Sequence, residues 1–139
     1  MQKEQAIEEA AVLADTANVV MVGTIGDEGY PNIKAMFKME NKSLKEVWFS
    51  TNTSSKRVSQ IKTNSKTCVY FADTEQIKGL MLVGNMEVLH DVESKRRFWR
   101  VGFERYYPQG VNDPDYCILH FTSNWGNYYH ALTNFTFEL

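Results

Sequence analysis

The feature that most constrains this chain is a succession of β-type runs joined by short polar connections. The runs are rich in β-branched and aromatic residues and cover residues 19–25, 32–39, 46–50, 66–72, 78–89, 116–122 and 128–139. Sequential strands with tight connections favour antiparallel pairing and a barrel over a doubly wound sheet. The sequence therefore predicts a mainly β fold, a six- to seven-stranded antiparallel barrel with flanking α-helices.

Helical spacing of apolar residues predicts three helices beside these strands. The first covers residues 2–15, and the second is short and runs from its N-cap Ser55 to residue 64. The third begins after Asp91, has one apolar side and ends before Pro108.

Glycine positions predict two turns and one bend. Residues 26–29 should join the first two strands into a hairpin, and residues 123–127 should form the turn before the last strand. The long strand 78–89 is expected to bend near Gly84, since glycine in a strand interior often marks a bend or bulge.

Length and charge exclude several classes of protein. With 139 residues, the chain is expected to form a single domain over residues 1–139. Its net charge of −2 gives no electrostatic basis for binding nucleic acid, and no apolar run reaches membrane-spanning length. The start of the chain is unlike a signal peptide, and Cys68 and Cys117 are expected to stay reduced, so we expect a cytoplasmic protein.

The stretch from Val47 to Arg57 is the first candidate for a binding site. A β-type run leads through a polar loop to Ser55, and Lys56 and Arg57 follow at the start of the short helix. Free backbone N–H groups, hydroxyls and two cations at a helix N-terminus suit a phosphate group. An ordinary N-cap followed by solvated cations explains the same residues, so both interpretations stay open.

Four segments in a fixed order carry a family resemblance. The runs 29–36 (Gly-Tyr-Pro-Asn-Ile-Lys-Ala-Met), 47–51 (Val-Trp-Phe-Ser-Thr), 55–58 (Ser-Lys-Arg-Val) and 80–84 resemble the pyridoxamine 5′-phosphate oxidase-like superfamily. Within it, the chain is most similar to the general stress protein branch of flavin-binding split barrels. The resemblance implies an FMN cofactor in a groove between the two subunits of a homodimer.

The resemblance also implies which residues bind the cofactor. They lie on the second strand, at the end of the third strand and at the start of the short helix: Lys34, Ala35, Met36, Ser50, Thr51, Ser55, Lys56 and Arg57. Lys34 stands where the family has an arginine that reaches the FMN phosphate, and Ser50 and Thr51 are expected beside the isoalloxazine ring. The phosphate site that the residues suggest and the family's FMN phosphate site therefore coincide.

Departures from the family pattern limit the expected chemistry. Gly79 replaces a glutamine that contacts the flavin, and residues 127–131 replace the Arg-x-His substrate motif of the oxidase. Oxidation of pyridoxamine phosphate is therefore not expected, and no catalytic acid or base is assigned. The scattered histidines have no partners at metal-ligand spacing, so no metal site is predicted.

Three functional hypotheses follow from this pattern. The first is an FMN-dependent oxidoreductase that acts on an unidentified small molecule. The second is a non-catalytic flavin-binding stress or carrier protein. The third is a haem-binding split barrel, for which His120 or His130 would be the axial ligand. An aromatic group at Trp125, Tyr128 and Tyr129 either covers the flavin or packs within the protein.

Overall fold

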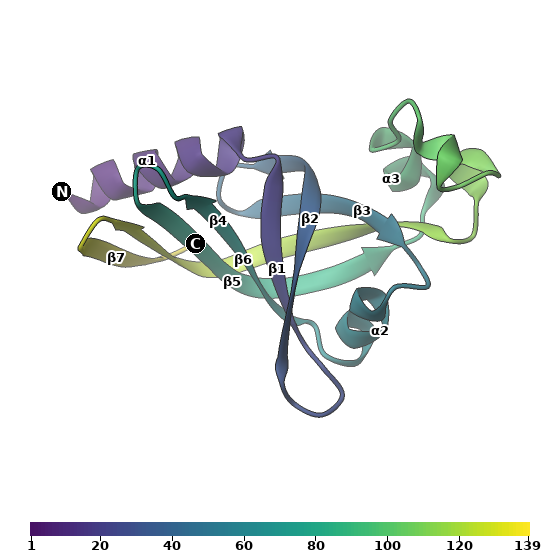
Figure 1. Ribbon diagram of the computed structural model, residues 1–139, viewed down its shortest axis with the longest axis horizontal. Coiled ribbons are helices and arrows are strands. Elements are labelled where there is room, and N and C mark those ends of the chain that lie inside the picture. The colour runs from purple at the N-terminus through teal and green to yellow at the C-terminus, as the bar shows by residue number, and fades with distance from the viewer.

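The computed structural model describes residues 1–139 and contains seven strands that pair only in antiparallel fashion (Figure 1). The strands are β1 (Val19–Ile25), β2 (Pro31–Lys42), β3 (Glu46–Asn52), β4 (Lys66–Asp73), β5 (Lys78–Leu89), β6 (Tyr116–His130) and β7 (Thr133–Glu138). The helical elements are α1 (Lys3–Thr16), α2 (Lys56–Thr63), α3 (Val92–Arg97) and the 3₁₀ turns η1 (Phe103–Arg105) and η2 (Gly110–Asn112).

Six of the strands close into a barrel. The strand order is β3-β2-β1-β4-β5-β6-β7, and an additional pairing between β3 and β6 joins the two ends of the six-stranded part. The seventh strand, β7, extends the sheet from β6. The predicted split-barrel fold is therefore confirmed. Six of the seven predicted strand regions lie within single strands, whereas the last, residues 128–139, is divided between the end of β6 and β7 by a turn at residues 131–132.

Two helices cover the barrel on different sides (Figure 1). The helix α1 packs on β4 to β7 and buries Ala6, Ala10 and Ala14 completely, since small side chains allow the helix to approach the strands closely. The helix α2 packs on β1 and β5 through Val58 and Ile61. No helix is long and apolar enough to span a membrane.

The predicted turn at residues 123–127 is wrong. Strand β6 continues through this segment, and a bulge beside Asn124 shifts its register with β5 between Val83 and Gly84. Gly126 leaves space for packing: a Cβ atom there would lie 3.0 Å from a ring carbon of Phe137. The chain turns instead after His130, a segment without glycine or proline.

The predicted helix from Asp91 to Pro108 is correct only in its first part. Asp91 caps α3 by accepting the Ser94 N–H at 2.9 Å, but the helix ends at Arg97. Gly102 then adopts a left-handed conformation with φ of 97°, which a continuous helix does not allow. The aromatic side chains of this segment pack against Trp48 and Tyr116 and do not follow one helical face.

Side chains of strand β2 alternate between the inside and the outside of the barrel. Met36 points into the barrel and is 9% exposed, whereas Ile33 and Phe37 point outward and are 73% and 70% exposed. The strand therefore carries apolar side chains on both faces, and only one face is covered by this chain.

Candidate functional site

The candidate site is the split between β2 and β3. These strands pair only where Lys38 to Lys42 lies opposite Glu46 to Phe49, and the register shifts between Lys38 and Glu40. Toward the β1–β2 turn the two strands separate, and a cleft of about 300 Å³ is present where their pairing has ended. The barrel is closed at one end of these strands and open at the other.

Lys38 fixes the end of the paired region. Its backbone N–H donates to the Asn18 carbonyl at 2.8 Å, and its ammonium group donates to the Ala14 carbonyl near the end of α1 and to Asn41 Oδ1. Burial lowers the Lys38 pKa, and the nearby Asp15 carboxylate partly opposes this effect. Lys38 therefore ties β2 to α1, while Lys34 on the same strand face stays exposed.

Side chains from three segments line the cleft. They are Lys34, Ala35, Met36, Phe37 and Met39 from β2, Ser50 and Thr51 from β3, and Phe103, Tyr106 and Tyr107 from the segment after α3. All five predicted cofactor-binding residues on β2 and β3 are among them. The cleft thus combines one cation and the hydroxyls of Ser50 and Thr51 with a mostly apolar and aromatic wall that includes two tyrosines.

The backbone of β2 also contributes polar groups to the cleft. Because the Lys38 N–H bonds to Asn18 beside β1, the alternation of an antiparallel ladder directs the backbone groups of Ala35 and Phe37 away from β1. At these positions β3 is no longer paired with β2. An open strand edge of this kind offers N–H and C=O groups to a planar ligand with polar ring atoms.

The aromatic wall was not predicted from the sequence. Phe103 and Tyr107 are held by Trp99 and Tyr116, with the Trp99 and Tyr116 rings 5.1 Å apart and the Tyr107 and Tyr116 rings 4.9 Å apart. Burial raises the pKa of Tyr107 to about 12 and keeps its hydroxyl neutral. The only sequence signal was the density of aromatic residues in this segment, which core packing explains equally well.

The predicted phosphate-binding residues at the start of α2 do not line this cleft. The Ser55 hydroxyl caps the helix by accepting the Val58 N–H at 3.3 Å, as an N-cap should. Arg57 is half-buried, and Lys56 is exposed. The loop before the helix is held by Asp115, which accepts the Ser54 N–H at 2.9 Å.

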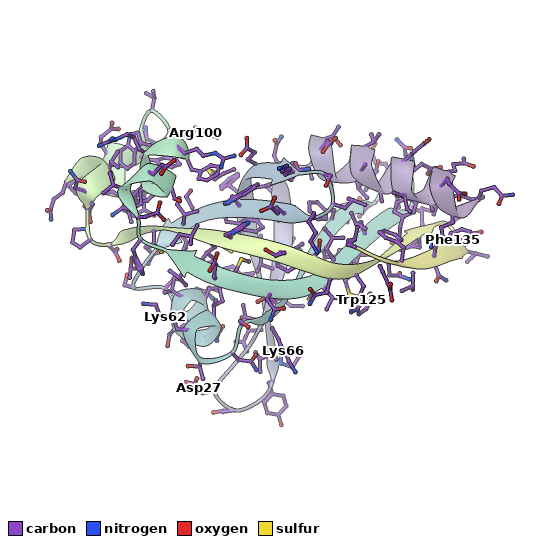
Figure 2. All side chains as sticks on the ribbon, turned by 180° about the vertical axis from the view of Figure 1, so that it is seen from behind. Asp27, Lys62, Lys66, Arg100, Trp125 and Phe135 are labelled. Carbon is purple, nitrogen blue, oxygen red and sulfur yellow. The ribbon has the colours of Figure 1, made fainter.

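Lys56 lines a second hollow, of about 420 Å³, between α2 and the β1–β2 turn. Asn32 of β2 also lines it, and Asn32 lies two residues before Lys34 on the same strand face. Figure 2 shows Asp27, at the tip of this turn, on the same side of the molecule as α2. The two hollows therefore border successive parts of β2, residues 31–32 and residues 34–39.

The histidines proposed as haem ligands lie outside the cleft. His120 stacks on Trp48, with Nε2 2.9 Å from Glu46 and Nδ1 3.3 Å from Glu87. His130 lies at the end of β6 with Nδ1 3.1 Å from Glu9. Both ring nitrogens of His120 and one of His130 are thus engaged with carboxylates, and neither side chain faces the split.

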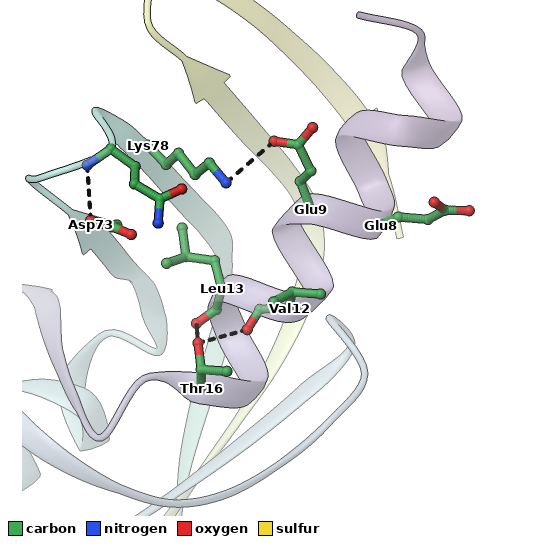
Figure 3. Close-up of a pocket in the computed structure, with 8 residues that line it drawn as sticks. Glu8, Glu9, Val12, Leu13, Thr16, Asp73 and Lys78 are labelled. Atoms are coloured by element: carbon green, nitrogen blue, oxygen red, sulfur yellow. Dashed lines mark hydrogen bonds and ion pairs between the residues drawn. The ribbon is translucent and has the colours of Figure 1, made fainter.

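A further hollow, of about 390 Å³, lies between α1 and the β4–β5 turn (Figure 3). Glu9 is its central charged group: its carboxylate accepts from the Tyr128 hydroxyl at 2.8 Å and lies 3.7 Å from Lys78 Nζ. These contacts lower the Glu9 pKa, with the Tyr128 hydrogen bond as the largest cause. The network attaches α1 to the barrel, so the hollow has a structural explanation.

The aromatic group at the predicted turn is divided between two faces of the sheet. Tyr128 is buried in the core, whereas Trp125 is 37% exposed and lines an outward hollow of about 370 Å³. Figure 2 shows Trp125 apart from Arg100, which lies in the segment after α3. None of Trp125, Tyr128 and Tyr129 lines the cleft between β2 and β3.

Comparison with known proteins gives one family. A sequence model described as "Pyridoxamine 5′-phosphate oxidase like" matches residues 5–138. A solved structure from Clostridium acetobutylicum, described as related to general stress protein 26 of B. subtilis, is 49% identical to this chain, and the match covers 99% of this chain and 97% of the other, with a TM-score of 0.89. A comparison with curated proteins gave no match.

Two more distant structures share the fold. One is a pyridoxamine 5′-phosphate oxidase-related, FMN-binding protein from Nostoc punctiforme, with 10% identity, coverage of 99% of this chain and 91% of the other, and a TM-score of 0.75. The other is a haem-binding protein from Mycobacterium smegmatis, with 14% identity, coverage of 99% and 60%, and a TM-score of 0.78. At these identities the likeness concerns the fold alone.

Proposed function

The chain belongs to the pyridoxamine 5′-phosphate oxidase like family, and from this premise we propose that it binds FMN in the cleft between β2 and β3. The observation that carries the proposal is the cleft itself. Its apolar wall suits the faces of a flavin ring, and the open edge at Ala35 and Phe37 suits the polar rim of that ring. A related split barrel from Nostoc punctiforme is described as FMN-binding.

The charges beside the cleft support a phosphate position. Lys34 is the one cation in the wall of the cleft, and Lys56 lines the adjoining hollow beside α2. A phosphate between them would meet two ammonium groups near the N-terminus of a helix, which favours anions. Arg57 follows Lys56 in the first turn of α2 and adds a third positive charge to this region.

We further propose that two copies of the chain form the complete site. The outward face of the sheet carries a continuous apolar row across five strands, formed by Ile33, Gly23, Cys68, Val83 and Trp125 in register. A contiguous apolar row on the outer face of a sheet is a candidate interaction surface. Ala35 and Phe37 belong both to this face and to the cleft, so a second copy on the face would also cover the ligand.

When bound, FMN supplies two-electron redox chemistry. The protein's own residues would bind the phosphate, orient the ring through the strand edge and exclude water with the aromatic wall. No histidine, cysteine, aspartate or glutamate side chain lines the cleft, so we assign no catalytic acid or base. We therefore propose an oxidoreductase in which the chemistry is supplied by the cofactor, with a small substrate other than pyridoxamine phosphate.

The visible absorption spectrum of the purified protein tests this proposal. We expect a flavin doublet, and we expect stripped protein to regain it on titration with FMN but not with riboflavin, which lacks the phosphate. A Soret band, or the failure of stripped protein to bind FMN, would overturn the proposal. Anaerobic mixing with NADH or NADPH, followed by a panel of electron acceptors, then separates an enzyme from a flavin carrier that is not reduced or does not turn over.

A further inference from the structure

The aromatic segment after α3 forms the outer wall of the cleft. Phe103 and Tyr107 are fixed by their ring contacts with Trp99 and Tyr116, and the Tyr107 N–H donates to the Phe103 carbonyl at 2.9 Å. Tyr106 differs from them: it lines the cleft, but it is 67% exposed and belongs to none of these ring pairs. A tyrosine ring beside a cleft with one face uncovered is available to a planar ligand.

Two cations of the same segment, Lys95 and Arg97, make contacts away from the cleft. Lys95 is buried, donates to the Asp113 carbonyl at 3.2 Å and lies over the Tyr116 ring. Arg97 pairs with Glu40 and lies over the Trp48 ring at 5.0 Å.

Arg100, the next cation of the segment, reaches the Met39 carbonyl at 3.4 Å. None of the arginine side chains lines the cleft, and Lys34 is its only cation. The outer wall therefore presents aromatic surface without a positive charge for an anionic substrate.

We propose that Phe103 and Tyr106 are specificity-determining residues that bind an uncharged, planar aromatic substrate in the outer part of the cleft. This inference rests on the proposed function, in which FMN occupies the inner part beside Lys34, Ser50 and Thr51. The substrate ring lies against Tyr106 on one side, and Phe103, already fixed by Trp99, limits the depth of the site. A phosphate or carboxylate on the substrate would lose its hydration here without gaining a charged partner.

The test compares two probes that differ by one charged group, with FMN-loaded protein in isothermal titration calorimetry. We expect 2-naphthol to bind and 2-naphthyl phosphate to bind at least tenfold more weakly. Tyr106→Ala should weaken 2-naphthol binding about fivefold, the effect of one lost aromatic contact, whereas Tyr106→Phe should retain it. Val101→Ala, a change at a fully exposed residue of the same segment, is the matched control and should have no effect.

The FMN affinity of each variant shows whether a negative result refutes the proposed FMN site or only the proposed substrate site. If wild-type protein binds no FMN, both the proposed function and this inference are refuted. If wild-type protein binds FMN but Tyr106→Ala weakens the binding of FMN as much as the binding of 2-naphthol, Tyr106 contacts the cofactor. The proposed substrate site is then refuted. Equal or tighter binding of the phosphate probe, or no binding of 2-naphthol, would refute the inferred substrate class while leaving the flavin proposal intact.

Discussion

At the scale of single residues, Lys34 is the one cation that lines the proposed cofactor cleft. It is exposed, it lines the cleft, and no hydrogen bond or ion pair within the chain uses its ammonium group. We predict that Lys34→Ala weakens FMN binding by about 1.5–3 kcal/mol, the value of one hydrogen bond to a charged group. Lys42→Ala, at the paired end of the same strand, should leave the affinity unchanged, as measured by quenching of FMN fluorescence.

The same FMN titration measures the contribution of Lys56, the exposed cation at the start of α2. If the phosphate lies between the two hollows, Lys56→Ala should weaken FMN binding in the same range as Lys34→Ala. An FMN affinity of the Lys56→Ala variant equal to that of wild type would contradict this assignment, because a lost contact to the phosphate should weaken binding.

Glu9 gives the folded protein a specific pH dependence. Its pKa is lowered from an ordinary value of 4.5, chiefly by the Tyr128 hydroxyl, so the ionised carboxylate stabilises the folded state. This contribution is complete above pH 4.5 and is lost as pH falls through the lowered pKa of the folded state.

We therefore expect Glu9→Gln to be less stable than wild type at about pH 7 in urea unfolding, with the difference narrowing at about pH 3. Glu8→Gln, on the exposed side of α1, is the control and should change little at either pH. A difference that stays the same at both pH values would show that packing, not ionisation, explains the effect.

At the scale of elements, the bulge between β5 and β6 requires glycine at one position. A Cβ atom on Gly84 would lie 2.0 Å from the Thr122 carbonyl oxygen, a backbone atom that cannot rotate away. A Cβ atom on Gly126 would meet only side chains, those of Leu82 and Phe137, at 2.9 Å or more.

We predict that Gly126→Ala costs about 1–3 kcal/mol of unfolding free energy, as overpacking usually does, and that Gly84→Ala costs more than this. Denaturant unfolding of the two variants checks the order. A smaller loss for Gly84→Ala than for Gly126→Ala would mean that the bulge rearranges easily.

The elements also show how far local sequence patterns can predict this fold. Strand boundaries were predicted well wherever polar turn residues surround β-branched runs, as for β1 and β5. The pattern failed at Gly126, because glycine that makes space for a neighbouring ring looks the same in sequence as glycine in a turn. It failed again after Arg97. There the path of the chain depends on contacts with Trp48 of β3 and Tyr116 of β6, which the local sequence does not show.

The candidate site also combines features that the local sequence predicts with features that depend on tertiary structure. Ser55 as an N-cap is a local feature and was predicted correctly, with its cap bond to Val58. The meeting of Lys34 with Ser50 and Thr51 depends on two strands that separate, and only the family resemblance indicated it. The aromatic wall at Phe103 and Tyr106 depends on how α3 ends, which the local spacing of residues did not predict.

At the scale of the whole molecule, the outward face of the sheet links assembly to cofactor binding. Ile33 lies at the β2 end of the apolar row on this face, is 73% exposed and lines the outward hollow but not the cleft. Leu132 is equally apolar and 99% exposed, but it lies in the β6–β7 turn, away from that row. The two residues therefore form a matched pair for testing whether this face holds a second copy.

We predict that the wild-type protein sediments as a dimer, that Ile33→Asp is monomeric and that Leu132→Asp stays dimeric, because only the first change buries a charge in the proposed interface. Analytical ultracentrifugation measures this directly. Since Ile33 does not contact the cleft, weaker FMN binding by the Ile33→Asp monomer would show that the second copy covers the cofactor. A monomeric wild-type protein would refute the dimer, and full FMN affinity in a monomeric variant would show that one copy alone holds the cofactor.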